Sequence, residues 1–124
     1  MHAIIIEKDA LNARLIKQCL IVLGYTTFSF AATLDNAVFA ATLQRPDLIT
    51  ADVQLKEGNG IDAVQTICAT NPSPVLFIVG DSRPVDGRFP SAAVLNKPFA
   101  LHQFAERVHE AVSLFDQRER AAKA

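Results

Sequence analysis

The stretch Leu48-Ile49-Thr50-Ala51-Asp52 decides the fold of this chain. A short, mostly apolar run of this kind is typical of a parallel strand that is covered on both faces. We therefore expect a central strand over residues 48–51. The aspartate directly after it leaves the carboxyl end of the strand, where parallel sheets place their ligand-binding groups. Asp52 is accordingly the first candidate for a reactive group.

Four further segments have the character of strands. Residues 3–6 and 75–79 are apolar throughout, which favours buried strands. Residues 26–30 alternate polar and aromatic side chains, a pattern typical of a half-buried strand at the margin of a sheet. Residues 92–95 form a shorter run that is still within the usual length of a strand. Five strands are therefore predicted.

The segments between the first three strands have helical periodicity. The first helix is predicted to begin at the capping residue Asp9 and to end at Gly24, because glycine suits a left-handed stop. Its core-facing side is predicted from an apolar stripe: Leu11, Leu15, Cys19 and Leu23, with Ile16 and Leu20 beside them. The second helix is predicted to begin at Thr33 and to end before Pro46.

Two more helices are predicted after the central strand. A turn with Gly58 and Gly60, both able to take positive φ, precedes the third. Its apolar stripe is Ile61, Val64, Ile67 and Cys68, and that of the last helix is Leu101, Phe104, Val108, Ala111, Val112 and Phe115. Residues 82–91 contain two prolines, a glycine and no helical stripe, so a short or irregular fourth helix, or a loop, is expected there.

Strands that alternate with helices in this way predict a doubly wound α/β fold, with a parallel sheet covered by helices on both faces. In such sheets ligands bind outside the carboxyl ends of the strands. Glu7, Asp52, Val79-Gly80 and Lys97 all follow or end predicted strands. The fold alone therefore predicts that they surround one pocket.

Length and charge limit the remaining possibilities. The 124 residues, 50% of them hydrophobic, fit a single domain over residues 1–124, with residues 116–124 as a frayed continuation of the last helix. The net charge is −1, and basic residues cluster only in the C-terminal tail. Neither nucleic acid nor a lipid surface is expected as a partner.

Cysteines and histidines do not indicate a metal site. Cys19 and Cys68 lie in helix-like segments and are expected to be buried, reduced thiols. His2, His102 and His109 lack metal-ligand spacing and are expected to be solvated. The chain has neither a signal-peptide pattern nor an apolar run close to the roughly 20 residues that span a membrane, so we expect a cytoplasmic protein.

Four motifs together resemble the receiver domain of two-component response regulators, and the resemblance covers nearly the whole chain. They are Ile4-Ile5-Ile6-Glu7, the segment 45–55 around Asp52, the turn 58–62, and Asn96-Lys97-Pro98-Phe99. The resemblance implies a flavodoxin-like sheet with strand order 2-1-3-4-5. It also implies a phosphoaccepting signalling module in a phosphorelay rather than an enzyme.

By this resemblance, Asp52 is the phosphoacceptor and Lys97 is the charge partner of the phosphoryl group. A cis peptide bond before Pro98 would direct the lysine toward the aspartate. A carboxylate nucleophile of this kind works with a divalent cation that neutralises the phosphoryl oxygens. The positions that match the Mg²⁺ ligands of receivers are Glu7, Asp52 and the backbone carbonyl of Gln54.

The partners implied by the resemblance are proteins. A histidine kinase or phosphotransferase would supply the phosphoryl group, and a downstream protein would receive the signal. The implied docking surface consists of the first helix, the fourth-helix region and the fifth strand. No effector domain is expected within the chain.

Lys8 is the main departure from the receiver pattern. Receivers carry two adjacent acidic residues after the first strand, whereas this chain has Glu7-Lys8. A cation next to the metal position lowers the affinity for Mg²⁺, because two unit charges about 4 Å apart interact by roughly 4 kcal/mol at an effective dielectric of about 20. Mg²⁺ is therefore expected to bind weakly or not at all, unless Lys8 turns to solvent or Asp9 substitutes. Lys8 could also pair with Asp52.

The switch positions also depart from the pattern. Val79 stands where receivers commonly carry the hydroxyl of Thr or Ser, and Val94 stands at the position of their aromatic switch residue. The segment Phe77-Ile78-Val79-Gly80 resembles the Phe-Ala-Thr-Gly motif of alphaproteobacterial stress-response receivers in two of its four positions. Coupling between the site and the output surface is expected to be altered.

Three functional interpretations remain. The chain is either a phosphorylatable receiver, or a pseudo-receiver that binds its partners constitutively. An aspartyl hydrolase on a related sheet is disfavoured, because such enzymes carry a second aspartate two residues after the nucleophile and this chain has Gln54 there. Glu7 and Asp9 could also serve only the N-terminus of the first helix.

Overall fold

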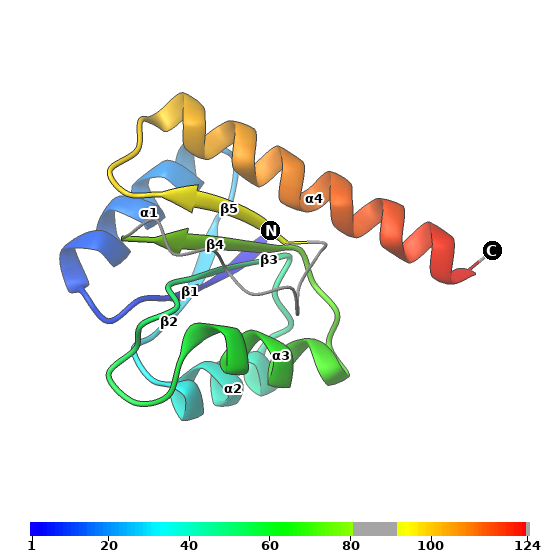
Figure 1. Ribbon diagram of the computed structural model, residues 1–124, viewed down its shortest axis with the longest axis horizontal. Coiled ribbons are helices and arrows are strands. Elements are labelled where there is room, and N and C mark those ends of the chain that lie inside the picture. The colour runs from blue at the N-terminus through cyan, green and yellow to red at the C-terminus, as the bar shows by residue number, and fades with distance from the viewer. Residues whose placement is uncertain (81–91, 124) are drawn as a thin grey trace.

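The computed structural model describes residues 1–80 and 92–123. Its strands form one parallel sheet in the order β2-β1-β3-β4-β5 (Figure 1). The strands are β1 (His2–Ile6), β2 (Thr27–Ala31), β3 (Leu48–Ala51), β4 (Val75–Val79) and β5 (Ala93–Asn96). The predicted fold class, strand order and marginal position of β2 are confirmed.

Four helices cover the two faces of the sheet. They are α1 (Ala10–Val22), α2 (Leu34–Leu43), α3 (Gly60–Thr70) and α4 (Leu101–Lys123). Helices α1 and α4 lie on one face, and α2 and α3 lie on the other (Figure 1). The predicted fourth-helix region, residues 82–91, lies outside the described residues.

Alternate residues of each central strand pack into two separate hydrophobic cores, one on each face of the sheet. In β1, Ile5 packs with α1 and α4, whereas Ile4 and Ile6 pack with α2 and α3. All three are at most 1% exposed. Full burial of such a side chain stabilises the fold by about 1.5 to 3 kcal/mol, so burial on both faces stabilises the central strands.

The buried face of α1 differs from the prediction. Leu11 is 76% exposed and Leu15 is 49% exposed, while the helix is buried through Ala13, Ile16, Cys19 and Leu20. The reason is geometric: residues spaced by four drift about 40° around a helix at each step, so a long stripe of that spacing cannot remain against the sheet. Ile16 and Leu20, which were predicted to lie beside the apolar stripe, are buried in the core instead.

The helix termini follow their capping residues. Asp9 accepts backbone hydrogen bonds from Leu11 and Asn12 at 2.9 and 3.1 Å, and Thr33 accepts one from Asn36. These bonds satisfy amides that have no partner inside the helix. Both predicted starts are confirmed.

The two turn glycines have different roles. Gly58 has the positive φ that the turn was expected to need, at +77°. Gly60 does not, but a Cβ added to it would lie 1.8 Å from the carbonyl oxygen of Asp52. Its backbone N–H also donates to the carbonyl of Val53 at 2.8 Å. Gly60 is therefore required for space rather than for a left-handed backbone.

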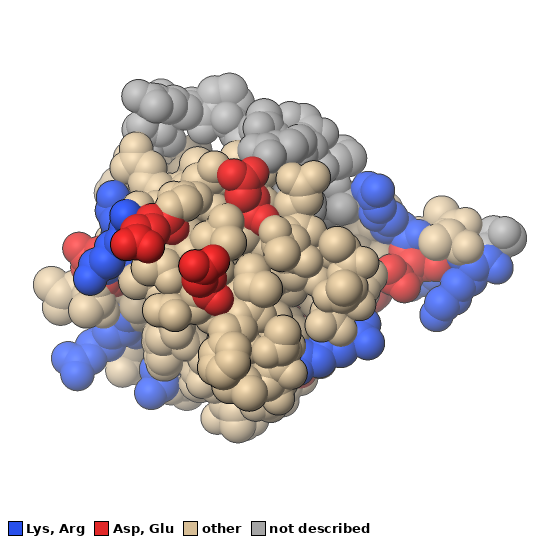
Figure 2. Space-filling model, turned by 90° about the horizontal axis from the view of Figure 1, so that it is seen from below, with Lys and Arg blue, Asp and Glu red and all other residues tan. Residues whose placement is uncertain are grey.

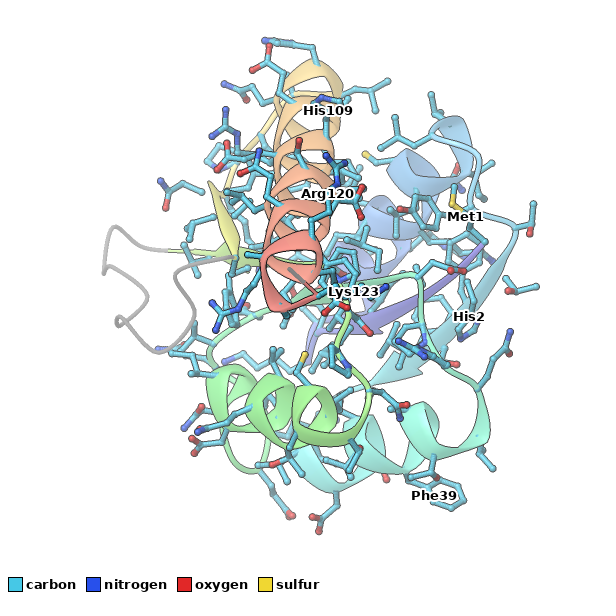
Figure 3. All side chains as sticks on the ribbon, turned by 90° about the vertical axis from the view of Figure 1, so that its right-hand side faces the viewer. Met1, His2, Phe39, His109, Arg120 and Lys123 are labelled. Atoms are coloured by element: carbon cyan, nitrogen blue, oxygen red, sulfur yellow. The ribbon has the colours of Figure 1, made fainter. Side chains whose placement is uncertain are left out.

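His2 is buried, so the expectation that all three histidines are solvated is wrong for this residue. Only 4% of His2 is exposed, and its ring nitrogens lie 2.8 Å from the hydroxyl of Thr27 and 2.9 Å from that of Ser29. Burial lowers the pKa of His2 despite the nearby charge of Asp47. His109 lies exposed on α4, away from this position (Figure 3).

Thr50 is expected to limit stability. Its hydroxyl is buried, and no described residue offers it a hydrogen-bond partner. Because an unsatisfied buried hydroxyl costs free energy, Thr50→Val is expected to raise the free energy of unfolding by about 1 kcal/mol. Urea denaturation measures this change.

A matched control for that substitution is Thr42→Val in α2. The Thr42 hydroxyl is exposed and donates to the carbonyl of Phe39 at 2.6 Å. Its loss is expected to change stability by less than about 0.5 kcal/mol. A lower stability of Thr50→Val than of the wild type would mean that the buried hydroxyl is satisfied in solution.

The outer surface of α2 and α3 carries little charge. The face formed by α2 and α3 is largely uncharged and carries a few separate acidic groups (Figure 2), and neither helix contains a lysine or arginine. Phe39 of α2, 62% exposed, points away from the body of the protein (Figure 3).

Helix α4 extends past the sheet to Lys123, through the segment that was expected to fray (Figure 1). No described helix has the length and hydrophobicity needed to cross a membrane.

Candidate functional site

The carboxyl ends of the strands bring three predicted residues together. Ile6 pairs with Ala51 in the sheet, so the residues that follow them, Glu7 and Asp52, leave adjacent strands at the same level. Lys97 follows β5, and its backbone N–H donates to the carbonyl of Val79 at 2.8 Å. This bond holds Lys97 at the same edge of the sheet as Glu7 and Asp52. The peptide bond between Lys97 and Pro98 is cis, as the resemblance to receiver domains implied.

The Lys97 ammonium bridges the two carboxylates. Its Nζ lies 2.7 Å from Glu7 Oε1 and 2.9 Å from Asp52 Oδ2. The side chains of Glu7, Asp52 and Lys97 are 2%, 12% and 18% exposed. Burial lowers the pKa of Lys97, but the hydrogen bonds and charges of the two carboxylates outweigh it, so the pKa lies above its ordinary value of 10.5. The lysine is therefore firmly held as a cation.

The second oxygen of each carboxylate accepts a backbone hydrogen bond. Glu7 Oε2 accepts from the N–H of Asp9 at 3.2 Å, and Asp52 Oδ1 accepts from the N–H of Gln54 at 3.1 Å. These bonds fix the orientation of both groups. Of the two, Asp52 keeps the larger accessible surface and is the carboxylate that an incoming group can reach.

Lys8 and Asp9 take no part in this cluster through their side chains. Lys8 is exposed, and among the described residues it forms no ion pair, so the pairing of Lys8 with Asp52 considered above does not occur in this structure. Asp9 uses its side chain to cap α1. The described residues contain no group of three or more His, Cys, Asp or Glu side chains arranged to hold a metal ion.

The three switch positions lie on or beside β4 and β5. Val79 ends β4 and is 4% exposed, and Gly80 follows it at the surface. Val94 lies in β5 and is 37% exposed. The valine side chain has no hydrogen-bonding group and Val79 packs in the core on the α2 and α3 side, so it offers no hydroxyl at the end of β4.

Loops on neighbouring strands also support the site. Lys56 donates a backbone hydrogen bond to Ala32 at 3.1 Å, and Leu34 donates one to Glu57, also at 3.1 Å. These bonds join the loop after β3 to the loop after β2. They were not predicted, because pairing between two loops leaves no periodic pattern in the sequence.

The site, the strand order and the cis peptide bond agree with one family. The model of the response regulator receiver domain matches residues 3–109. The chain belongs to this family. Receiver domains are signalling modules of two-component systems, so the resemblance seen in the sequence is confirmed.

Several relatives of this receiver are regulators. It is 34% identical to the phyllosphere-induced regulator PhyR of Methylorubrum extorquens, over 98% of this chain and 46% of that protein. It is 31% identical to the transcriptional regulatory protein PdtaR of Mycobacterium tuberculosis, over 92% of this chain and 58% of that protein. The chain thus spans about half the length of these curated relatives.

A solved receiver domain has the same architecture. The PhyR receiver domain of Erythrobacter litoralis superposes with a TM-score of 0.76 and 28% identity, covering 90% of this chain and 88% of the other. Receiver domains as a family act through protein partners.

Proposed function

We propose that this receiver accepts a phosphoryl group on Asp52 and conveys the signal through protein contacts. The observation that carries the proposal is the contact of the Asp52 carboxylate with the Lys97 ammonium at 2.9 Å. Asp52 is oriented by a backbone hydrogen bond, and 12% of its side chain remains exposed at the end of a rigid strand. A positioned carboxylate beside a fixed cation suits nucleophilic attack on phosphorus.

The phosphoryl group would come from a phosphohistidine of the donor protein. An oxygen of Asp52 forms a bond to phosphorus as the phosphorus–nitrogen bond of a phosphohistidine donor breaks. The donor imidazole nitrogen keeps the electron pair and takes a proton, and Asp52 becomes an acyl phosphate. Lys97 would then face one carboxylate, Glu7, and one phosphoryl oxygen, which preserves its charge balance.

The residues at this site fit a divalent cation poorly. The two carboxylates share one ammonium, and the exposed residue Lys8 stands where receivers carry a second carboxylate, so that ligand is missing. Asp9 lies outside the cluster, and its Oδ1 caps α1. We propose that Mg²⁺ binds weakly and that phosphoryl transfer here depends chiefly on Lys97.

Lys8→Asp is therefore expected to tighten Mg²⁺ binding at least about tenfold, since a like charge near the metal becomes a ligand. Titration of Mg²⁺ followed by amide NMR shifts of residues 7–9 and 52–54 measures the dissociation constant. Lys123→Asp, at the far end of α4, makes the same charge change outside the site and is expected to leave the constant unaltered. Equal constants for wild type and Lys8→Asp would contradict the charge argument.

Phosphorylation is tested by incubation with phosphoramidate and Mg²⁺, followed by intact mass measurement. The wild type is expected to gain one phosphoryl group, and Asp52→Asn is expected to gain none. Asp62→Asn, in α3, is the matched control and should be modified like the wild type. Absence of modification in the wild type, while a reference receiver is modified in parallel, would refute the proposal.

The alternative function is a pseudo-receiver, which binds its partner without modification. Val79 favours it, because a buried valine at the end of β4 offers a phosphoryl oxygen no hydroxyl. In that case affinity for the partner would be the same with and without phosphodonor, and the same in Asp52→Asn.

The partners proposed are a histidine kinase or phosphotransferase and a downstream protein. Helix α1 starts directly beside the Glu7–Asp52–Lys97 cluster and exposes Leu11 and Leu15, which suits a protein contact. Strand β5 offers the partly exposed Val94. The remaining part of the expected docking surface, residues 82–91, lies outside the described residues.

A further inference from the structure

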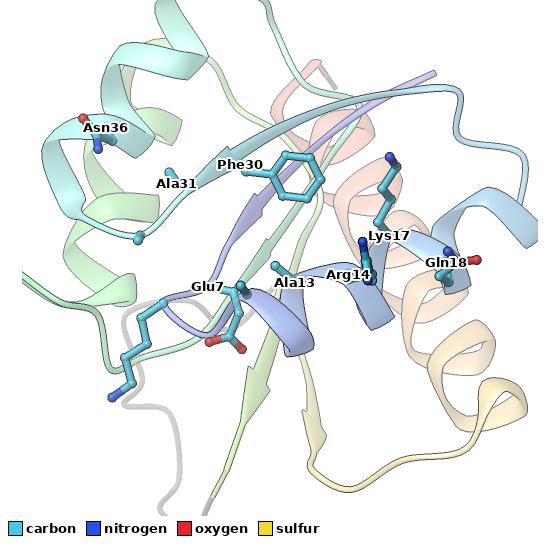
Figure 4. A pocket seen from close by; sticks show the side chains of 11 residues that line it. Glu7, Ala13, Arg14, Lys17, Gln18, Phe30, Ala31 and Asn36 are labelled. Carbon is cyan, nitrogen blue, oxygen red and sulfur yellow. The ribbon is translucent and has the colours of Figure 1, made fainter.

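A groove beside the phosphoacceptor cluster has no role in the proposed phosphotransfer. It runs between the N-terminal half of α1 and the end of β2, reaches the start of α2, and has a volume of about 600 Å³ (Figure 4). This volume lies within the range of about 300 to 1,000 Å³ that is usual for small-molecule sites. The groove opens at the margin of the sheet, where β2 has a neighbour on one side only.

Positive charge dominates the groove. Lys8, Arg14 and Lys17 line it, and none of them pairs with a carboxylate among the described residues. The one acidic residue in the lining is Glu7, whose side chain is 2% exposed and whose carboxylate is bound to Lys97. In Figure 4 this carboxylate turns away from Phe30. Three cations that have no carboxylate partner in the described part of the chain, in a protein of net charge −1, favour an anionic occupant.

An aromatic ring forms the opposite wall. Phe30 of β2 is 50% exposed, and Arg14 and Lys17 of α1 lie across from it (Figure 4). The Lys17 ammonium is held 5.6 Å from the centre of the Phe28 ring, so its position is restricted. A flat group stacked on Phe30 would cover apolar surface while its anionic end reached Arg14 and Lys17.

Amide groups complete the lining. Gln18 of α1 and Asn36 of α2 both line the groove, and their side-chain amides have no hydrogen-bond partner among the described residues. Amides of this kind can donate to and accept from the polar edge of a heterocycle. The alanines Ala13 and Ala31 keep the floor shallow and apolar.

From this combination we propose that the groove binds a small anion with a flat heteroaromatic body, the chemistry of a nucleoside phosphate. The cations would hold the phosphate, and Phe30 would stack on the base. Because Glu7 is the one residue of the Glu7–Asp52–Lys97 cluster that also lines the groove, an occupant would lie next to the site without entering it.

The test uses adenosine monophosphate, which is not a phosphodonor for an aspartate, in the absence of metal. Amide NMR shifts are expected to move along residues 8–18 and 30–36, with a dissociation constant below about 1 mM. Adenosine and inorganic phosphate, added separately, are each expected to bind at least about tenfold more weakly, because each lacks one half of the contacts.

Three variants locate the site. Arg14→Gln is expected to weaken binding at least about tenfold through the loss of a charge-assisted hydrogen bond. Phe30→Ser is expected to weaken it about fivefold or more through the loss of stacking. Arg118→Gln, which removes an exposed arginine of α4 outside the lining, is expected to leave it unchanged. Thermal unfolding midpoints verify that each variant is folded.

Several outcomes would overturn the proposal. They are the absence of shifts in these segments at about 5 mM adenosine monophosphate, equal binding by inorganic phosphate, and unchanged binding by Arg14→Gln. Tighter binding by a tetraglutamate peptide than by the nucleotide would identify the groove as a docking site for an acidic protein segment, and the proposal would then be wrong. None of these outcomes bears on phosphorylation of Asp52, so the two proposals fail independently.

Discussion

Replacing Gly60 with alanine is expected to lower the free energy of unfolding by about 3 kcal/mol, a large effect for one methyl group. The added Cβ would lie 1.8 Å from the carbonyl oxygen of Asp52 and 2.8 Å from its carbonyl carbon. These are backbone atoms, so no side-chain rotation can relieve the overlap. Either the start of α3 or the backbone of Asp52 must move.

The substitution is also expected to displace the Asp52 carboxylate. A shift of the Asp52 backbone would break the hydrogen bond from Gln54 to Asp52 and displace the carboxylate from Lys97. Urea denaturation measures the loss of stability, and the amide shifts of residues 52–54 report the displacement. Gly80→Ala is the matched control, because a Cβ at Gly80 meets no described atom within 4 Å and its φ is not positive.

The control is expected to change stability by less than about 0.5 kcal/mol. Equal stabilities for Gly60→Ala and Gly80→Ala would show that the loop after β3 has room which the structure does not indicate. The account of Gly60 as a packing requirement would then be wrong.

Lys97→Met is expected to lower the free energy of unfolding by about 3 kcal/mol at neutral pH in the absence of metal. Methionine keeps the length of the side chain but removes the ammonium that lies 2.7 Å from Glu7. Glu7, with a side chain only 2% exposed, would remain as a buried carboxylate without a cation, beside the carboxylate of Asp52. Chemical denaturation near pH 7 measures this cost.

A double variant separates the charge from the packing. If the cost arises from the uncompensated carboxylate, Glu7→Gln combined with Lys97→Met should be more stable than the sum of the single effects by about 1 to 2 kcal/mol. Additive effects would mean that Lys97 stabilises the fold through its aliphatic chain alone.

The stability that Lys97 contributes is expected to fall at alkaline pH. Because the pKa of Lys97 in the folded protein is raised above 10.5, the stability it contributes is fully present below pH 10.5 and is lost as the pH rises through the folded-state pKa. The difference in stability between the wild type and Lys97→Met should therefore be constant near neutral pH and shrink in strongly alkaline solution. A difference that grows with alkaline pH would contradict the ion-pair account.

Much of the fold could be predicted because the pattern was local. The apolar runs of β1 and β3, the alternation of β2 and the caps Asp9 and Thr33 each follow from a few neighbouring residues. The buried face of α1 could not be predicted in the same way. Whether Leu15 or Ile16 faces the core depends on how the helix is rotated against the sheet, and that rotation is set by side chains from distant strands.

The three residues of the cluster were predictable for a topological reason. Parallel strands place their carboxyl ends at one edge, so Glu7, Asp52 and Lys97 were expected at that edge once the strands were identified, and the cis bond implied by the family resemblance directs Lys97 toward the carboxylates. Two supporting details were not predictable. One is the hydrogen bond from the Gln54 N–H to Asp52, and the other is the lack of space for a side chain at Gly60. Both depend on how the loop after β3 folds back. In the sequence, Gly58 and Gly60 indicated only conformational freedom.

The most direct test of the central claim is to locate the phosphoryl group in the chain. After incubation with phosphoramidate, borohydride reduces an aspartyl phosphate to homoserine, which peptide sequencing by mass spectrometry can place. We expect homoserine at position 52 and unmodified carboxyl groups at Glu7 and Asp9. Homoserine at another aspartate, or an intact Asp52 under conditions that modify a reference receiver, would contradict it.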